Sequence, residues 1–384
     1  MLSLSKLIVP SSWPATANAS SDAAHQATRA LALTLELITL DQVQRFDASR
    51  FALLSGFAYP NATLERFKVC NDWLAWFFFF DDQADEKAEV GQRPLTLRNY
   101  MEACLAVLRT GARRSNPTGL ELFTLNVRKR MLPIASDAWL VRFADDVEDY
   151  LLKGTLTAAE NWTHGSVPEV EPYRVQRRYD SSMYACEDLI EITEEGLELP
   201  AEILSDARFQ TLRHLCTEVV AFTNDVFSYE KEVLKHRNPN NLLHVLMTHR
   251  SLSLQEATTQ AIEIINTDVE TFVAQERGLR AKLALDERLH AYVQGMKAWM
   301  RGNLLWSLQT GRYCSPTSPF PELRSGDWGR QTRAIERGGA SYKVERNKRI
   351  RSKEPATTKK RLPLSSAHAL KLLDELQHLG ANML

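Results

Sequence analysis

The stretch WFFFFDDQADE, residues 76–86, changes from aromatic to acidic side chains within one predicted helical window. Five aromatic residues stand directly beside four acids. Burying carboxylates among rings costs free energy, and a bound metal ion is the usual group that offsets this cost. Asp81 and Asp85 are four residues apart, so a helix presents both on one face.

The same helical face carries aromatic rings one turn deeper than the acids. Phe77 and Phe78 precede Asp81 by four and three residues, and Asp82 and Glu86 flank the carboxylate pair. This order predicts metal-binding carboxylates at the rim of an apolar cavity. A buried helix that simply reaches the surface at Asp81 explains the pattern equally well, so a second signal is required.

Helical periodicity extends along most of the chain. Only 16 Gly and 15 Pro interrupt 384 residues, and apolar residues recur at three- and four-residue spacing between them. The clearest windows are 64–80, 139–152, 172–192, 209–234, 254–274 and 285–310. No window shows the alternation of a half-buried strand. We therefore predict an all-α, single-domain helical bundle.

Composition limits the possible partners and compartments. Lys plus Arg (47) nearly balance Asp plus Glu (48), so the chain has no overall field that would recruit nucleic acid, and no nucleic-acid partner is expected. The N-terminus lacks the unbroken apolar region of a signal peptide, and the most apolar run, 73–80, is far shorter than the roughly 20 residues of a membrane span. Five scattered cysteines fit a reducing compartment. These features predict a cytoplasmic protein without a membrane span.

The C-terminal part differs in character from the rest. Between positions 324 and 363 there are thirteen Lys or Arg and four Asp or Glu, with few large apolar residues. We predict a catalytic domain over 1–320, a basic and flexible tail over 321–363, and a short amphipathic helix over 364–384.

A second oxygen-rich motif supplies the signal that the acidic stretch needs. In NDVFSYEKE, residues 224–232, Asn224, Ser228 and Glu232 fall at i, i+4 and i+8 and line one helix edge. Hard cations such as Mg²⁺ prefer oxygen donors of this kind. An ordinary exposed helix edge is the alternative, but the preceding CTEVVAF is largely apolar, which favours a metal site.

Cations complete the pattern. Arg178 lies in a predicted helix, Arg312 and Tyr313 stand where the last long helix ends, and Lys231 is beside the second motif. Forked arginine donors suit phosphate groups. The neighbouring Arg177 is interpreted as a surface residue. Together, the two oxygen-rich motifs and these cations predict a site that binds a diphosphate through magnesium ions.

In these motifs the chain resembles class I terpene synthases of the microbial type, over roughly residues 5–316. The acidic motif corresponds to Asp81, Asp82 and Asp85, and the second metal motif, N-D-x-x-S-x-x-K-E, corresponds to Asn224, Asp225, Ser228, Lys231 and Glu232. The diphosphate-sensing arginine of the family, 46 residues before the asparagine, falls on Arg178. Its C-terminal Arg-Tyr pair falls on Arg312 and Tyr313, and Trp306 takes the position of an aromatic wall residue.

The resemblance implies an enzyme in a helical bundle with a central cavity, which uses Mg²⁺, usually three ions, to ionise an allylic prenyl diphosphate. A fifteen-carbon substrate is the first expectation, with ten- and twenty-carbon substrates as alternatives. Phe77, Phe78, Trp306 and Phe57 are the candidate rings that would stabilise the carbocation. Where the family often has a Gly after the sensor arginine, this chain has Ser181 and Ser182, and Ser182 is the candidate for the ionisation trigger. A monomer or a homodimer is expected.

Two other interpretations remain open. Residues Asp145, Asp146 and Asp149 form a further DDxxD, and two such motifs are typical of chain-elongating prenyl diphosphate synthases. The two motifs are too close together for that family, so we interpret 145–149 as a solvated helix face. The other rival is a non-catalytic helical binding protein that has kept the fold, which the loss of a ligand would favour.

Overall fold

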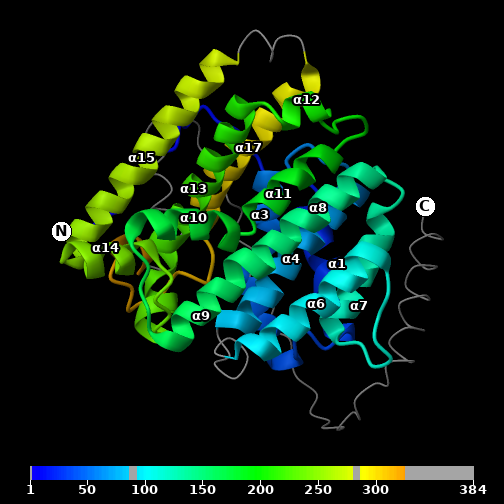
Figure 1. The fold of residues 1–384 in the computed structure, drawn as a ribbon, viewed down its shortest axis with the longest axis horizontal. Helices are drawn as coiled ribbons and strands as arrows, with labels where there is room; N and C mark the ends of the chain where they lie inside the picture. The colour runs from blue at the N-terminus through cyan, green and yellow to red at the C-terminus, as the bar shows by residue number, and fades with distance from the viewer. Residues whose placement is uncertain (1, 86–92, 280–285, 325–384) are drawn as a thin grey trace, which may run out of the picture.

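The computed structural model describes residues 2–85, 93–279 and 286–324. In these ranges the chain is helical and contains no strand, which confirms the predicted all-α class (Figure 1). The α-helices are α1 (Ser21–Thr34), α2 (Val43–Ser49), α3 (Phe51–Ala58), α4 (Leu64–Asp85), α6 (Pro94–Thr110), α7 (Gly119–Met131), α8 (Asp137–Asp149), α9 (Leu156–His164), α10 (Val170–Asp180), α11 (Met183–Asp188), α12 (Ala201–Leu204), α13 (Ala207–Tyr229), α14 (Leu242–Arg250), α15 (Leu254–Gly278) and α17 (Glu287–Ser307). Short 3₁₀ segments are η1 (Leu40–Gln42), η3 (Leu189–Ile192) and η5 (Pro321–Leu323), and π-helical segments are η2 (Tyr150–Thr155) and η4 (Glu230–Lys235).

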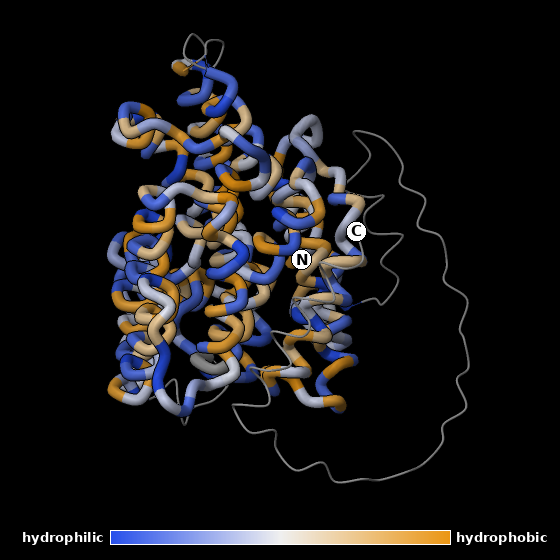
Figure 2. Tube along the Cα trace, turned by 90° about the vertical axis from the view of Figure 1, so that its right-hand side faces the viewer, coloured by the Kyte–Doolittle hydropathy of each residue, from blue (hydrophilic) through white to orange (hydrophobic). Residues whose placement is uncertain are grey.

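Helix α4, which contains the aromatic and acidic stretch, lies near the middle of the molecule in Figure 1 and packs against α1, α3 and α7. Trp73, Trp76, Phe77 and Phe80 are all buried, because an apolar helix with neighbours on several sides has no solvent face. The Trp76 and Phe80 rings stack with centroids 5.4 Å apart, and Trp76 Nε1 donates to Thr124 Oγ1 at 2.8 Å. In Figure 2 the other helices alternate between hydrophilic and hydrophobic positions, as amphipathic helices around a core do.

Helices α13 and α17 form the other half of the core. Helix α13 packs against α15 and α17, and α17 packs against α3. The start of α13 is set by Asp206, whose side chain accepts from the backbone N–H groups of Arg208 and Phe209. Helix α15 begins at a capping box formed by Ser253 and Glu256. With α4, helices α13 and α17 contribute to the wall of the cavity described below.

Three of the predicted helical windows deviate from a regular α-helix next to that cavity. The window 139–152 changes from α-helix to the π-helix η2 after Asp149. The window 172–192 breaks between α10 and α11, where Ser182 adopts a left-handed conformation with φ of 59°. The window 209–234 changes from α-helix to the π-helix η4 after Tyr229. Segments of π-helix are frequent at functional sites because they change the direction of side chains within a helix.

The described part of the chain extends beyond the predicted end of the catalytic domain. Leu323 in η5 is buried, and its N–H donates to the Phe320 carbonyl. The basic tail from 325 onward and the helix predicted over 364–384 lie outside the described residues, so the domain boundaries stay predictions. In the described ranges no helix combines the length and the apolar character that crossing a membrane requires. The cytoplasmic location and the oligomeric state stay predictions as well.

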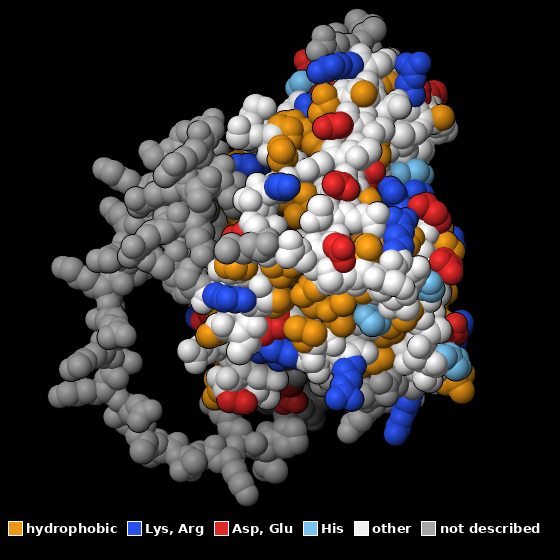
Figure 3. Space-filling view, turned by 90° about the vertical axis from the view of Figure 1, so that its left-hand side faces the viewer, with side chains coloured by type: hydrophobic (Ala, Val, Ile, Leu, Met, Phe, Trp, Pro, Cys, Tyr) orange, Lys and Arg blue, Asp and Glu red, His pale blue; other side chains and the backbone are white. Residues whose placement is uncertain are grey.

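The face that carries the N-terminus, α14 and α15 has mixed character (Figure 3). Basic and acidic side chains are interspersed over it, and apolar side chains gather near its centre. The interspersed charges agree with the near balance of the whole sequence.

Candidate active site

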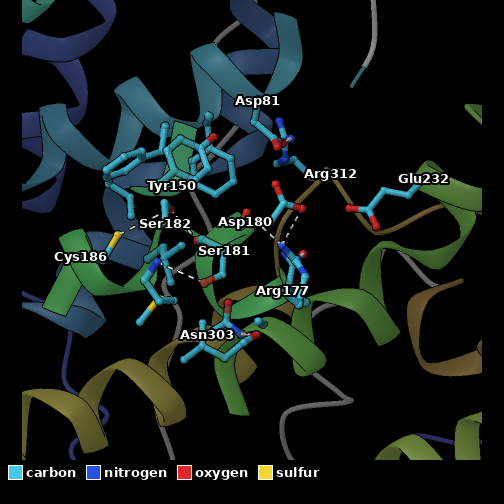
Figure 4. A pocket seen from close by; sticks show the side chains of 18 of the residues that line it. Asp81, Tyr150, Arg177, Asp180, Ser181, Ser182, Cys186, Glu232, Asn303 and Arg312 are labelled. Atoms are coloured by element: carbon cyan, nitrogen blue, oxygen red, sulfur yellow. Dashed lines mark hydrogen bonds and ion pairs between the residues drawn. The ribbon is translucent and has the colours of Figure 1, made fainter. Parts of the chain in front are cut away.

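A cavity that is open to solvent at its mouth lies between α4, the junction of α10 and α11, the end of α13 and the end of α17 (Figure 4). Ten of the residues predicted from the sequence line it: Phe77, Phe78, Asp81, Ser182, Asn224, Lys231, Glu232, Trp306, Arg312 and Tyr313. Residues from positions 77 to 313 thus meet at one site.

On the α4 side of the mouth, the side chains of the predicted carboxylates Asp81 and Asp82 have different surroundings. Asp81 borders the cavity. Asp82 is turned toward cations instead: it accepts from Arg312 Nη2 at 2.9 Å, and Lys231 Nζ is 3.6 Å away. Burial opposes ionisation of Asp82, but the charges of Arg312, Lys231 and Arg45 outweigh it and hold the pKa well below its usual range. The side chain of Asp85 lies outside the described part, so its role as a ligand stays a prediction.

On the α13 side of the mouth, two residues of the second predicted ligand set, Asn224 and Glu232, line the cavity, whereas Ser228 does not. Asn224 Nδ2 donates to Tyr313 Oη at 2.6 Å, and Asn241 Nδ2 donates to Glu232 Oε2 at 3.0 Å. Ser228 is fully buried, and its Oγ has no hydrogen-bond partner among the described residues. Glu232 belongs to the π-helix η4, so it is placed by a widened turn and not by the regular α-helix that i+8 spacing assumes.

These residues fit a hard divalent cation. The buried Ser228 hydroxyl lacks a partner, as expected of a group whose ligand is an ion. Burial and the nearby charge of Asp225 raise the pKa of Glu232, and a cation bound beside it would favour its ionised form. All the donors are oxygen atoms, which suits Mg²⁺ better than a soft metal. In the described ranges no cluster of three His, Cys, Asp or Glu side chains offers a competing metal site.

The structure corrects the assignment of the two adjacent arginines on α10. Arg178 does not line the cavity, because its Nε donates to Glu218 at 2.6 Å on the α13 side. Arg177, which we interpreted as a surface residue, lines the cavity, and its side chain is only 11% exposed. Its Nη2 donates to Asn224 Oδ1 at 3.0 Å and its Nε donates to Asp225 Oδ1 at 2.8 Å. Arg177 is therefore the arginine that can reach a ligand at the cavity mouth.

Asp225 explains why Arg177 is held in this position. It is fully buried and accepts from Tyr173 Oη at 2.7 Å and from the Leu242 N–H at 2.9 Å, besides Arg177. A buried carboxylate needs such partners to remain stable. Sequence reasoning assigned no separate role to Asp225, and in the structure Asp225 orients Arg177 beside Asn224.

The junction of α10 and α11 contributes Asp180, Ser181 and Ser182 to the cavity (Figure 4). Burial raises the pKa of Asp180 to about 7 against the opposing charge of Arg177, and the charge of Asp81 adds to the rise. Ser182 Oγ donates to the Ser181 carbonyl and Ser181 Oγ donates to the Arg178 carbonyl. The predicted trigger position, Ser182, thus lies on the cavity wall, and its ionising role stays a prediction.

The C-terminal Arg-Tyr pair closes the mouth from the α17 side. The guanidinium of Arg312 lies over the Phe78 ring, 4.9 Å from its centroid, and also contacts Asp82. Burial raises the pKa of Tyr313 to about 12, although the Arg312 charge acts against this, so the phenol stays protonated and can donate. Its hydroxyl accepts from Asn224, which joins the pair to the metal motif.

Three of the four candidate rings reach the cavity. Phe77, Phe78 and Trp306 line it, and the Phe78 and Trp306 centroids are 5.6 Å apart. Phe57 was predicted to line the cavity and does not. It packs against Gly302 of α17, where a Cβ would approach the Phe57 Cβ to 2.5 Å, so its ring belongs to the core contact between α3 and α17.

Several lining residues were not predicted. They include Tyr150, Met183, Cys186, Trp299 and Asn303. Trp299, Asn303 and Trp306 follow i, i+4 and i+7 spacing, so the helical face of Trp306 contained the signal for the other two. Tyr150 offered no such signal, because it reaches the cavity through the π-helix η2.

The further DDxxD at 145–149 does not border the cavity. Asp145 accepts from Arg109 at 2.7 Å, Asp149 pairs with Lys153 at 2.7 Å, and Asp146 accepts from the buried Arg213 at 3.1 Å. Each of the three acids is thus paired with a protein cation, and two of them lie on a partly solvated face, as interpreted from the sequence.

Comparisons with known proteins agree with this geometry. Residues 72–271 match the family model described as terpene synthase family 2, C-terminal metal binding. A germacrene A synthase from Nostoc punctiforme is 32% identical over 271 residues, which cover 70% of this chain and 83% of that protein. A (+)-T-muurolol synthase, described as (2E,6E)-farnesyl diphosphate cyclizing, from Roseiflexus castenholzii is 31% identical over 319 residues, 83% and 96% of the two chains. The crystal structure of a-eudesmol synthase superposes with a TM-score of 0.70 at 21% identity, over 79% of this chain and 99% of that one, which shows a shared fold.

Proposed function

The chain belongs to the terpene synthase family, and we propose that it is a magnesium-dependent cyclase that acts on farnesyl diphosphate. It would ionise the diphosphate, cyclise the resulting carbocation to a sesquiterpene hydrocarbon or alcohol, and release diphosphate. One observation carries the proposal. Asp81 of α4, Asn224 of α13 and Glu232 of η4 line the same cavity as the aromatic side chains Phe77, Phe78 and Trp306.

Asp81 on one side and Asn224, Ser228 and Glu232 on the other would hold the magnesium, with Asp82 and Asp85 as the remaining α4 carboxylates. Three ions are the number that the family resemblance implies. When bound, they would neutralise the charge that develops on the leaving diphosphate.

The cations of the chain bind and orient the diphosphate. Arg177, Lys231 and Arg312 reach the mouth from three different elements, and Tyr313 adds a neutral donor. Donors that are fixed before the reaction stabilise developing negative charge without reorganisation, and they act more strongly in a site that excludes water. Carbon–oxygen bond cleavage then needs no nucleophile from the protein.

The aromatic side chains of the cavity wall would stabilise the positive charge of the carbocation. Phe77, Phe78 and Trp306 line the cavity in which an allylic cation would be left after ionisation. Ring faces attract a cation without reacting with it as a base or a nucleophile. Within 76–86, the aromatic residues would thus stabilise the carbocation, and the acidic residues would hold the magnesium that binds the diphosphate.

The substrate length rests on the relatives. One of them is described as cyclizing (2E,6E)-farnesyl diphosphate, which supports a fifteen-carbon substrate here. Geranyl and geranylgeranyl diphosphate are the alternatives in the same reaction class. Chain elongation has less support, because the second DDxxD is paired with protein cations away from the cavity.

The test incubates purified protein and Mg²⁺ with the ten-, fifteen- and twenty-carbon prenyl diphosphates separately, and analyses a hexane extract by gas chromatography with mass detection. A cyclic product from the fifteen-carbon substrate alone, absent with Asn224→Ala, is the expected result. A product from another chain length corrects the substrate. Longer diphosphates formed after addition of isopentenyl diphosphate support the elongase, and no turnover by folded protein supports the non-catalytic alternative.

A further inference from the structure

The apolar wall of the cavity contains one amide side chain on α17. Asn303 lies one turn after Trp299 and one turn before Trp306, and all three line the cavity. Asn303 is only 3% exposed, and the two tryptophans are equally buried. In Figure 4 it is drawn at the opposite end of the view from Asp81, beyond Ser181. The amide is therefore placed among the residues that would surround the hydrocarbon and away from the metal motif on α4.

The orientation of the amide follows from its one hydrogen bond. Asn303 Nδ2 donates to the backbone carbonyl of Val220 on α13 at 3.2 Å. A carbonyl oxygen can only accept, so the NH₂ group must face Val220, and Oδ1 must point elsewhere. Oδ1 accepts from no described residue, and it is not one of the fully buried side-chain atoms that lack a partner, so it is accessible from the cavity. The structure thus fixes an acceptor without a protein donor on the cavity wall.

An amide oxygen on the cavity wall without a protein donor can still accept a hydrogen bond from a molecule inside the cavity. Buried polar atoms without protein partners are commonly satisfied by ordered water. A water that donates one hydrogen to Oδ1 keeps its oxygen lone pairs free toward the interior of the cavity.

We propose that Asn303 holds a water molecule that captures the last carbocation, so that the main product of this chain is a cyclic terpene alcohol. This inference rests on the proposed cyclase function and specifies its product class. The water oxygen forms a bond to the cationic carbon, and the oxonium then loses one proton. The proton passes to an oxygen of the diphosphate that ionisation has already released in the same cavity, so charge and atoms balance.

A second polar group in the lining provides a matched control. Thr155, at the end of η2, also lines the cavity, and its Oγ1 is buried without a hydrogen-bond partner. It comes from the opposite half of the sequence and not from α17. If any buried hydroxyl or amide in the lining held the nucleophilic water, Thr155→Val would change the product as much as Asn303→Leu.

The experiment runs wild type, Asn303→Leu and Thr155→Val with farnesyl diphosphate and Mg²⁺ in water enriched in ¹⁸O. It measures the alcohol-to-hydrocarbon ratio, the ¹⁸O content of the alcohol and the rate of diphosphate release. We expect a wild-type alcohol that carries ¹⁸O, and in Asn303→Leu a fall in the ratio of at least about tenfold, the effect of one lost hydrogen bond. Diphosphate release should stay within a few-fold of wild type, and Thr155→Val should keep the alcohol.

The other outcomes are distinguishable. No diphosphate release by wild type contradicts the proposed function itself. Diphosphate release with hydrocarbons as the only wild-type products leaves the cyclase intact and overturns the role of Asn303, as does an unchanged product ratio in Asn303→Leu. Should Asn303→Leu fail to fold, Asn303→Val makes the same removal with a shorter side chain, and the same outcomes apply.

Discussion

At the scale of single residues, Arg177 and Arg178 provide a direct test of the diphosphate site. The two are adjacent, yet only Arg177 contacts Asn224 and Asp225, whereas Arg178 contacts Glu218. Arg177→Lys keeps the charge but loses the forked donor, and we expect kcat/KM to fall by about 100-fold, the typical cost of one lost donor to developing charge. Arg178→Lys should stay within a few-fold of wild type. Steady-state release of diphosphate measures both, and equal losses would contradict the assignment.

A second prediction at this scale concerns the dependence of stability on pH. Glu187 is fully buried between Arg213 and Thr217, and burial raises its pKa to about 7 although Arg213 acts to lower it. The folded protein therefore binds this proton more tightly than the unfolded chain does. The contribution to stability is complete below the unfolded pKa of 4.5 and is lost as the pH rises through about 7.

Glu187→Gln removes that titration. Between pH 5 and pH 8 we expect the free energy of unfolding to decline less steeply than in wild type, by up to about 3 kcal/mol over the interval. Urea unfolding across this range measures the slope, and Glu65→Gln, at an exposed side chain, serves as the control. An identical slope in wild type and Glu187→Gln would show that Glu187 does not titrate in this range.

At the scale of elements, sequence periodicity predicted the positions of the helices but not their departures from regular α-helix beside the cavity. The windows around α4, α13 and α17 were found because their apolar spacing is set by local burial. The π-turns η2 and η4 and the break at Ser182 depend on contacts between elements that are distant in sequence. The choice between Arg177 and Arg178 has the same origin, since the packing of α10 against the buried Asp225 decides which side chain faces inward.

Gly154 shows how one such contact is built. It belongs to η2, and a Cβ added there would lie 2.5 Å from the Asp180 N and Cα, atoms of the backbone at the end of α10. The π-helix can therefore pack directly on the junction that places Asp180, Ser181 and Ser182 in the cavity.

Gly154→Ala should displace that junction. We expect a loss of about 1–3 kcal/mol in the free energy of unfolding, as for other overpacked sites, and a fall in kcat that exceeds any change in KM. Gly278→Ala, where the added Cβ would meet atoms no closer than 3.6 Å, is the matched helical control. Thermal unfolding and initial rates measure the two effects, and a stable, fully active Gly154→Ala would show that the junction does not depend on this close approach.

At the scale of the whole molecule, ion pairs between the charges of the site link the elements around it. Arg312 pairs with Asp82 and Lys231 approaches Asp82, which joins α4 to η4 and to the segment that follows α17. Arg177 pairs with Asp225, which joins α10 to α13. The carboxyl groups of Asp81, Asp180 and Glu232 also line the mouth, and burial raises the pKa values of Asp180 and Glu232. Magnesium alone would be repelled by the protein cations at the mouth, and diphosphate alone would be repelled by the carboxylates there.

Magnesium and inorganic diphosphate should therefore stabilise the protein together much more than either does alone. At a free ligand concentration about 100 times Kd, the expected gain is about 2.7 kcal/mol, which appears as a rise of several degrees in the melting temperature. Differential scanning fluorimetry with each component, with both, and with both plus EDTA measures this coupling. Ser228→Ala removes a predicted ligand whose hydroxyl has no partner among the described residues, so it should keep the melting temperature of the free protein and lose most of the combined shift. Equal and additive shifts from the two components, or a full combined shift in Ser228→Ala, would contradict a metal-bridged diphosphate between α4 and α13.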